Sequence, residues 1–179
     1  DAFAADNNRD TRNAVLALLD QAANAASTRV YNAANATGRQ GMTTTLVAVA
    51  VGGGAAFVAH VGDSRCYLIR QGQLRQLTED HSMVNELIKT GALAPEEAEK
   101  SQYKNVITRA VGLYPNVRAD TLHVELIDGD RLLLCTDGLT DMVSAGNMLK
   151  LLQLANLTQA VDGLIANALE KGGKDNVTA

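Results

Sequence analysis

Residues 44–78 read TTLVAVAVGGGAAFVAHVGDSRCYLIRQGQLRQLT, and this stretch decides the fold class. Three apolar runs, at 44–51, 55–61 and 65–70, are separated by short turns that contain glycine. A fourth run, at 74–78, follows one more glycine turn. Runs of this length and composition predict strands, and connections this short join antiparallel neighbours. The stretch therefore predicts a largely antiparallel β-sheet.

Helical patterns precede and follow this sheet in the sequence. A long alanine-rich helix is predicted over residues 11–36, and two shorter helices over 145–154 and 157–171. A charged stretch with two short helical patterns, 82–100, interrupts the strands and reads as a surface excursion. Together these patterns predict an α+β fold in one domain. The apolar stripe expected on the first helix consists of Val15, Leu18, Leu19, Ala22 and Ala26, and further strands are expected at 106–111, 121–127, 131–135 and from 176 onward.

Composition excludes several classes of function. The 179 residues carry a net charge of -4 and contain no basic cluster, so a nucleic-acid partner is not expected. No apolar run approaches the roughly 20 residues that a membrane span needs. Cys66 and Cys135 are far apart and lie in apolar runs. They are expected to be buried free thiols, which fits a cytoplasmic protein.

The most informative side chains are acids at the ends of apolar runs. Asp63, Asp137 and Asp175 each lie close to a glycine, which lets backbone or a ligand approach closely. Carboxylates that converge in a cleft repel one another, and a hard divalent cation such as Mg²⁺ or Mn²⁺ relieves that repulsion. Each Asp-Gly pair taken alone is more typical of a turn in which the acid caps its own backbone, and only the longer strings favour a metal site.

Six strings, in order, resemble the successive motifs of the metal-dependent protein phosphatases, protein phosphatase type 2C. The resemblance covers the chain from about residue 10 to its end and is greatest to compact bacterial members that act on phosphoserine and phosphothreonine. The strings are Gly41-Met42-Thr43-Thr44-Thr45, Val61-Gly62-Asp63-Ser64-Arg65, Leu77-Thr78-Glu79-Asp80-His81-Ser82, Ile107-Thr108-Arg109-Ala110-Val111-Gly112, Leu134-Cys135-Thr136-Asp137-Gly138-Leu139-Thr140-Asp141 and Asp175-Asn176-Val177-Thr178.

This resemblance implies two packed, mostly antiparallel β-sheets flanked by helices, in a single domain over 1–179 with a flap at about 82–104. It implies that Asp137 and Asp175 bind two core Mn²⁺ or Mg²⁺ ions, and that Asp63 and Asp141 bind or tune a third. No catalytic residue is expected beyond these ligands, because the family uses a metal-activated water. The implied partner is a phosphorylated protein, either a kinase or a kinase target.

The sequence also departs from the family pattern. The family begins with an acid-rich strand containing arginine and an Asp-Gly-x-Gly-Gly-His string, and it continues past 176–178 with a strand. Neither feature is found here, so the domain is expected to be incomplete at both ends. Three explanations stay open: a fragment of a complete phosphatase, a non-catalytic relative that binds a partner, or a domain that another polypeptide completes.

Three histidines and two arginines have less specific expectations. His81, at the entrance to the flap, is expected to cap or hydrogen-bond near the site, with a role as catalytic acid left open. His60 is expected to be structural and His123 exposed. Arg65 and Arg109 are expected to support the sheet or pair with carboxylates.

Overall fold

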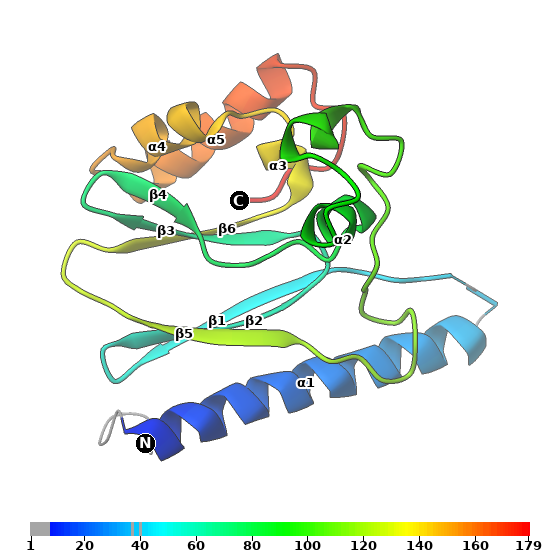
Figure 1. The fold of residues 1–179 in the computed structure, drawn as a ribbon. Helices are drawn as coiled ribbons and strands as arrows, with labels where there is room; N and C mark the ends of the chain where they lie inside the picture. The colour runs from blue at the N-terminus through cyan, green and yellow to red at the C-terminus, as the bar shows by residue number, and fades with distance from the viewer. Residues whose placement is uncertain (1–7, 37, 40) are drawn as a thin grey trace. The chain divides into compact units, whose positions relative to one another are not determined.

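A computed structural model describes residues 8–36, 38–39 and 41–179 of the chain. The chain divides into two compact units: unit 1 contains residues up to 63 together with 80–126, and unit 2 contains 64–79 and 127–179. Each unit has one three-stranded antiparallel sheet and helices of its own (Figure 1). The α+β class with two antiparallel sheets is therefore confirmed.

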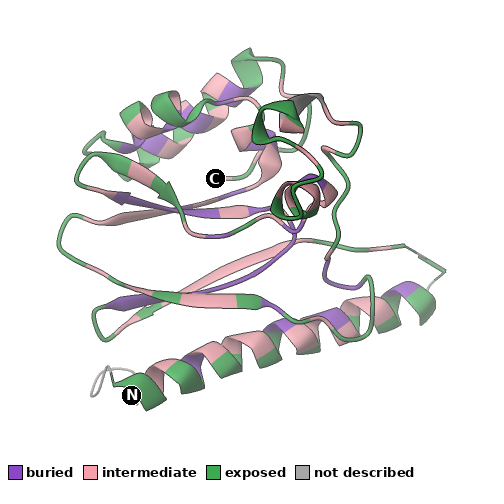
Figure 2. Ribbon diagram, viewed as in Figure 1, coloured by how far each residue is buried: buried purple, intermediate pink, exposed green. Residues whose placement is uncertain are grey.

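Unit 1 is built around a central strand that is buried along its whole length (Figure 2). The sheet order is β1-β2-β5, and both neighbours of β2 are antiparallel to it. This explains why the 55–61 run is apolar without alternation, since neither of its faces meets water. The elements of unit 1 are α1 (Arg9–Ala36), β1 (Leu46–Gly52), β2 (Ala55–Val61), α2 (Met83–Lys89), a short 3-10 helix η1 (Pro95–Lys100) and β5 (Asp120–Glu125).

Helix α1 packs on β2 and β5 through small and aliphatic side chains. Ala23 and Ser27 are fully buried on this face. Ala23 packs with Ala59 and Val61 of β2, and Ser27 Oγ donates to a carbonyl oxygen in the loop that precedes β5. The expected stripe is right for Val15 but wrong for Leu18, which is 62% exposed. Ala22 is also exposed. The buried stripe follows the steps from 15 to 19 to 23, each of which turns about 40° around the helix. Leu18 lies about 60° from Val15 in the other direction and therefore falls outside the stripe.

The strand expected at 106–111 is not formed. Ile107 makes one isolated bridge to Ser82, and Val111 makes isolated bridges to Thr44 and Tyr114. The segment that follows, 112–119, takes its hydrogen bonds from side chains of α1 instead of from a neighbouring strand. Ser27 Oγ accepts from Gly112 N–H, Asn24 Oδ1 from Val117 N–H and Asp20 Oδ1 from Ala119 N–H, at 2.9, 2.9 and 2.8 Å.

Unit 2 has the sheet order β4-β3-β6 and a leucine-rich core. That core contains Tyr67 of β3 and Leu133 of β6, which lie with Met148 and Leu164 of the following helices. A helical turn at 137–140 was not expected, because the sequence there reads as a turn. The elements are β3 (Arg65–Arg70), β4 (Gln73–Gln76), β6 (Arg131–Cys135), α3 (Asp137–Thr140), α4 (Ala145–Leu152) and α5 (Leu157–Glu170).

Both cysteines are free and buried, as expected. Burial raises the pKa of the Cys66 thiol to about 11, so this side chain behaves as an inert core residue. Among the helices that the structure describes, none is long and apolar enough to span a membrane.

Candidate functional site

Asp137 stands where β6 of unit 2 ends and α3 begins. Its Oδ1 accepts a hydrogen bond of 2.8 Å from the N–H of Gly138, the next residue. One helical turn later, the N–H of Asp141 donates to the carbonyl oxygen of Asp137 over 2.8 Å. Asp137 is half-buried and Asp141 is exposed. The short helix thus places two acids at one end of the sheet of unit 2.

The segment after α5 returns to this corner and brings Asp175 with it. The N–H of Thr136 donates to Thr178 O at 3.2 Å, and Thr136 Oγ1 donates to Asn176 O at 3.2 Å. Thr136 Oγ1 also accepts from Thr178 N–H at 3.1 Å. A Cβ on Gly138 would overlap the carbonyl group of Asn176, so only glycine lets this segment approach. The strand expected from residue 176 onward is limited to this pairing.

The chemistry of this corner suits a divalent cation. Asp175 Oδ1 accepts from Asn176 N–H at 2.7 Å, so each of Asp137 and Asp175 uses one oxygen on the adjacent backbone. Among the described residues, no lysine or arginine pairs with either acid. Hard cations prefer such oxygen ligands and complete their shells with water. Nowhere in the described residues do three or more His, Cys, Asp or Glu side chains form a group that could hold a metal ion.

Asp63 belongs to unit 1, where it follows Gly62 at the end of β2. Gly62 has a φ of 110°, which side chains of L-residues rarely adopt, and a Cβ there would lie 2.5 Å from Thr45 Cγ2. Its amide N–H donates to His81 Nδ1 at 3.0 Å. Its carbonyl oxygen accepts from His60 Nε2 at 2.8 Å and from the N–H of His81 at 2.9 Å. The turn that presents Asp63 is therefore held by two imidazoles.

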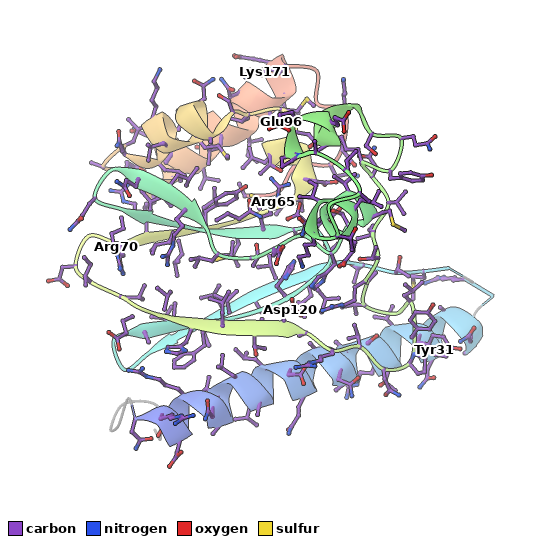
Figure 3. All side chains as sticks on the ribbon, in the orientation of Figure 1. Tyr31, Arg65, Arg70, Glu96, Asp120 and Lys171 are labelled. Carbon is purple, nitrogen blue, oxygen red and sulfur yellow. The ribbon has the colours of Figure 1, made fainter. Side chains whose placement is uncertain are left out.

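The two imidazoles continue into a charged pair of unit 1. Their ring centres are 4.4 Å apart, and both side chains are buried. Because His81 Nδ1 accepts a hydrogen bond, the neutral ring carries its proton on Nε2, which lies 3.2 Å from Asp120 Oδ2. Asp120, at the start of β5 (Figure 3), in turn accepts a hydrogen bond of 2.5 Å from Arg109. Four residues from three separate parts of the chain thus form one polar cluster.

This cluster is electrostatically arranged to keep both histidines neutral. Burial lowers the pKa of His60 and of His81, and for His60 the neighbouring His81 acts in the same direction. Desolvation opposes ionisation of Asp120, but hydrogen bonds from Arg109 and His81 outweigh it and lower the pKa of Asp120. A neutral His81 is the form that can accept from Gly62 N–H, so the electrostatics and the hydrogen bonds agree.

A family model described as Protein phosphatase 2C matches residues 2–173, which is nearly the whole chain. The chain belongs to the protein phosphatase 2C family. The resemblance seen in the six motifs is therefore confirmed, and the two antiparallel sheets with their helices are the fold that members of this family share.

Named members of the family are similar over most of this chain. The "Serine/threonine phosphatase stp" of Listeria innocua is 44% identical over 139 residues, which are 77% of this chain and 55% of that protein. A crystal structure of the Mycobacterium tuberculosis serine/threonine phosphatase PstP matches 90% of this chain and 69% of its own, with 38% identity and a TM-score of 0.85. A structure of the PstP catalytic domain with two manganese ions matches with 38% identity and a TM-score of 0.81, over 90% and 68% of the two chains. The chain thus spans about half the length of the curated relatives it matches.

The sequence predicted some residues of this candidate site and missed others. It singled out all four acids, and the structure brings Asp137, Asp141 and Asp175 to one corner of unit 2. His60 has the structural position expected of it, and His123 is exposed as expected. Asp120 was missed, because an acid at the start of a strand gives no signal that a buried histidine 39 residues earlier faces it.

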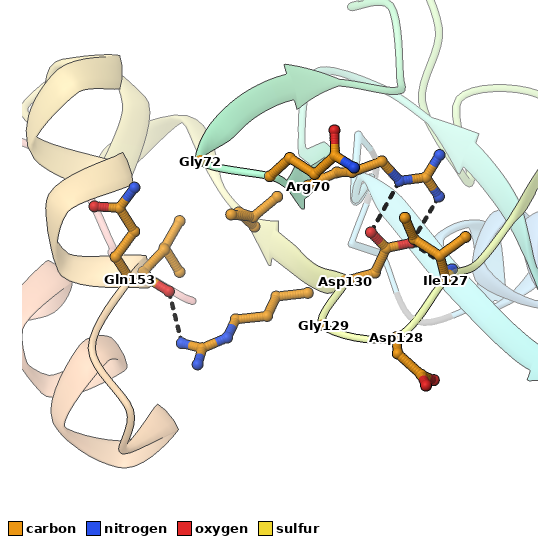
Figure 4. A pocket seen from close by; sticks show the side chains of 11 residues that line it. Arg70, Gly72, Ile127, Asp128, Gly129, Asp130 and Gln153 are labelled. Carbon is orange, nitrogen blue, oxygen red and sulfur yellow. Dashed lines mark hydrogen bonds and ion pairs between the residues drawn. The ribbon is translucent and has the colours of Figure 1, made fainter.

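Unit 2 also contains a cavity lined by two arginines, Arg70 and Arg131. It has a volume of about 340 Å³ and lies near the first residue of β6, whereas Asp137 follows the last one (Figure 4). Arg70 makes two hydrogen bonds of 2.9 and 2.6 Å to Asp130, and this pairing lowers the pKa of Asp130. Arg131 donates to the carbonyl oxygens of Leu152 and Leu154. Since both arginines are already bound to acceptors, this cavity is a poor site for a phosphate group.

Proposed function

We propose that this domain is the metal-binding part of a protein phosphatase that hydrolyses phosphoserine and phosphothreonine monoesters. The observation that carries the proposal is the corner where Thr136 and Gly138 hold Asp175 beside Asp137, with no cationic side chain of the described residues to neutralise the two acids. Family membership and the names of the relatives support the same reaction.

In this proposal the four acids have two roles. Asp137 and Asp175 hold two core ions, Mn²⁺ or Mg²⁺. Asp63 in unit 1 and Asp141 in unit 2 are each proposed to bind or tune a further ion. When bound, such ions neutralise phosphate charge and supply an acidic water as nucleophile. Hydrolysis forms a bond from water oxygen to phosphorus, breaks the ester bond, and releases inorganic phosphate and the free hydroxyl of serine or threonine.

The proposed substrate is a phosphorylated protein, either a kinase or the target of one. A cytoplasmic setting is part of the proposal, since reduced thiols such as Cys66 and Cys135 persist in that compartment. Mn²⁺ is the first ion to test, because the PstP catalytic domain was crystallised with two manganese ions.

The test replaces each core ligand by its amide. Asp137→Asn and Asp175→Asn should each lower Mn²⁺-dependent phosphate release from a phosphothreonine peptide by roughly a hundredfold or more, since metal ions supply several kcal/mol of transition-state stabilisation. Calorimetric titration with Mn²⁺ should show weaker binding in both variants. Asp162→Asn is the matched control, because Asp162 is an exposed acid on α5 of the same unit.

Three outcomes separate the possibilities. Loss of activity in both ligand variants, with the Asp162 control unchanged, supports the phosphatase. Full activity in either ligand variant contradicts the roles given to these acids. A wild-type protein that binds the phosphopeptide but releases no phosphate would be a binding module of the same fold, and the proposed reaction would then be wrong.

A further inference from the structure

We propose that His81 is a positioning residue: it fixes the turn that carries Asp63 and thereby sets how tightly the protein holds a divalent ion. This inference rests on the function proposed above, in which Asp63 is a metal ligand. His81 itself needs no contact with the ion or the substrate. Its effect is transmitted through the backbone of Gly62, the residue that precedes Asp63.

The first observation is that both backbone polar groups of Gly62 are hydrogen-bonded. Its N–H and its carbonyl oxygen are both bound to histidines, by three hydrogen bonds of 3.0, 2.8 and 2.9 Å, two of which involve His81. Gly62 is buried, so water does not compete for these groups. With both polar groups of Gly62 fixed, the direction in which the chain enters Asp63 is fixed as well.

The second step is the support of His81 itself. Its ring packs against that of His60 at a tilt of 32°, and its Nε2 faces Asp120, which Arg109 holds in place. Its carbonyl oxygen accepts from Thr108 N–H at 2.8 Å. The Nδ1 of the imidazole is therefore bound to Gly62, its Nε2 faces the carboxylate of Asp120 without a well-aligned hydrogen bond, and its main chain is bound to Thr108. These contacts favour the orientation of the ring toward Gly62.

The third step connects these hydrogen bonds at Gly62 to the base of the segment 82–104. Met83 N–H donates to Val106 O at 2.8 Å, and Ser82 and Ile107 form a bridge. Together with the bond from Thr108 to His81, these contacts close the base of the 82–104 segment. The same histidine therefore anchors both the turn of Asp63 and the base of this segment, and both belong to unit 1.

The experiment compares two nearly isosteric replacements of His81. In His81→Asn, the amide oxygen takes the place of Nδ1 and can accept from Gly62 N–H, whereas His81→Leu offers no acceptor. The first readout is hydrogen exchange of the Gly62 amide by NMR, which needs neither metal nor substrate. The second is the dissociation constant for Mn²⁺ from calorimetry. The leucine variant should lose Gly62 protection and raise this constant roughly fivefold, the effect of one lost hydrogen bond, and the asparagine variant should retain most of both.

A double-mutant cycle with Asp63→Asn tests whether the effect passes through Asp63. If it does, adding His81→Leu to Asp63→Asn changes the Mn²⁺ constant little, because the ligand that His81 positions is already lost. Purely structural damage would add to the effect of Asp63→Asn. His123→Asn is the control, since His123 is exposed on β5 of the same unit.

The outcomes are distinct. Equal behaviour of the asparagine and leucine variants, unchanged exchange at Gly62, or an additive cycle contradicts the role of His81, even when the wild-type protein is an active phosphatase. A wild-type protein without Mn²⁺-dependent hydrolysis contradicts the proposed function, and this inference with it. Rescue by asparagine together with a non-additive cycle supports the inference.

Discussion

The two units hold their candidate metal ligands in different ways. In unit 1, Asp63 follows a buried glycine that is bound by two imidazoles. In unit 2, Asp137 and Asp175 lie at a more exposed corner that is held by one hydroxyl group and by close backbone packing. The first arrangement needs buried side chains from distant parts of the sequence, while the second needs only a short helix and a returning segment. The position of Asp63 in unit 1 thus depends on hydrogen bonds between buried polar groups. The position of Asp175 in unit 2 depends on the absence of a side chain at Gly138.

The largest effect is expected from Gly62→Ala. Its Cβ would lie 2.5 Å from Thr45 Cγ2, at a backbone φ of 110°. Steric overlap and backbone strain each cost about 1–3 kcal/mol, so the free energy of unfolding should fall by about 2–6 kcal/mol. Urea denaturation measures this change.

Gly129→Ala of unit 2 is the control for backbone strain alone. Gly129 has a φ of 89°, but no atom lies within 4 Å of the position its Cβ would take. Its cost should be about 1–2 kcal/mol, the ordinary penalty for a left-handed residue. Equal losses at Gly62 and Gly129 would mean that the turn of Asp63 is not tightly packed.

The second effect concerns Gly138→Ala in unit 2. Alanine is acceptable in a helix, but the new methyl group would overlap the backbone of Asn176. We expect a loss of about 1–3 kcal/mol from overpacking, together with displacement of Asp175 and weaker Mn²⁺ binding. Calorimetry with Mn²⁺ and urea denaturation check the two parts.

Gly146→Ala is expected to change the stability in the opposite direction and serves as the comparison for Gly138→Ala. Gly146 lies in α4 of the same unit, and nothing lies within 4 Å of the position its Cβ would take. Alanine there should stabilise the protein by up to about 1 kcal/mol, because glycine is a poor helix former. Destabilisation by both substitutions to a similar extent would remove the special role of Gly138.

A smaller effect is expected from Thr136→Val. The change preserves shape but removes the hydroxyl that bonds Asn176 O and Thr178 N–H. The expected loss is about 1–2 kcal/mol, with faster hydrogen exchange at the Thr178 amide. Thr158→Val, on an exposed face of α5, should change neither quantity. Retained protection at Thr178 would show that close packing at Gly138 suffices to hold this corner.

The contrast between the units also explains how much the sequence could predict. The strings around Asp137 and Asp175 are local, so their Asp-Gly and Gly-Gly patterns already indicated acids at the ends of elements. The antiparallel sheets were equally predictable, because glycine turns join the strands at 44–78. The four acids remain a prediction as metal ligands, although three of them share one corner of unit 2.

The polar cluster of unit 1 could not be predicted in the same way. Asp120 and Arg109 reach His81 only after the chain has formed the excursion at 82–104 and the loop that leads to β5. Residues 106–111 looked like a strand because they are apolar and partly β-branched, yet their neighbours provide only isolated bridges. The local sequence pattern shows which residues of a segment are apolar. It does not show which strands the segment will pair with, because that depends on the paths of loops, and loops have no periodic pattern in the sequence.

The smallest expected effect is a difference in pH response between the units. All three histidines belong to unit 1, and unit 2 contains none. The pKa values of His60 and His81 are lowered from the ordinary 6.5, so folding disfavours their protonated forms. Their contribution to stability is complete above pH 6.5 and is lost as the pH falls through 6.5 toward the lowered folded values. Asp120 and Asp130 also have lowered pKa values, but carboxyl groups of this kind titrate below that range.

Hydrogen exchange can resolve this response strand by strand. Between pH 7 and 5.5, the protection factors of β2 amides, such as Val58, should fall relative to those of β3 amides, such as Leu68. His81→Asn should reduce the difference, because one of the two buried imidazoles is then absent. An equal fall in both strands, or an unchanged difference in the variant, would mean that buried histidines do not distinguish the turn of Asp63 from the corner of Asp137.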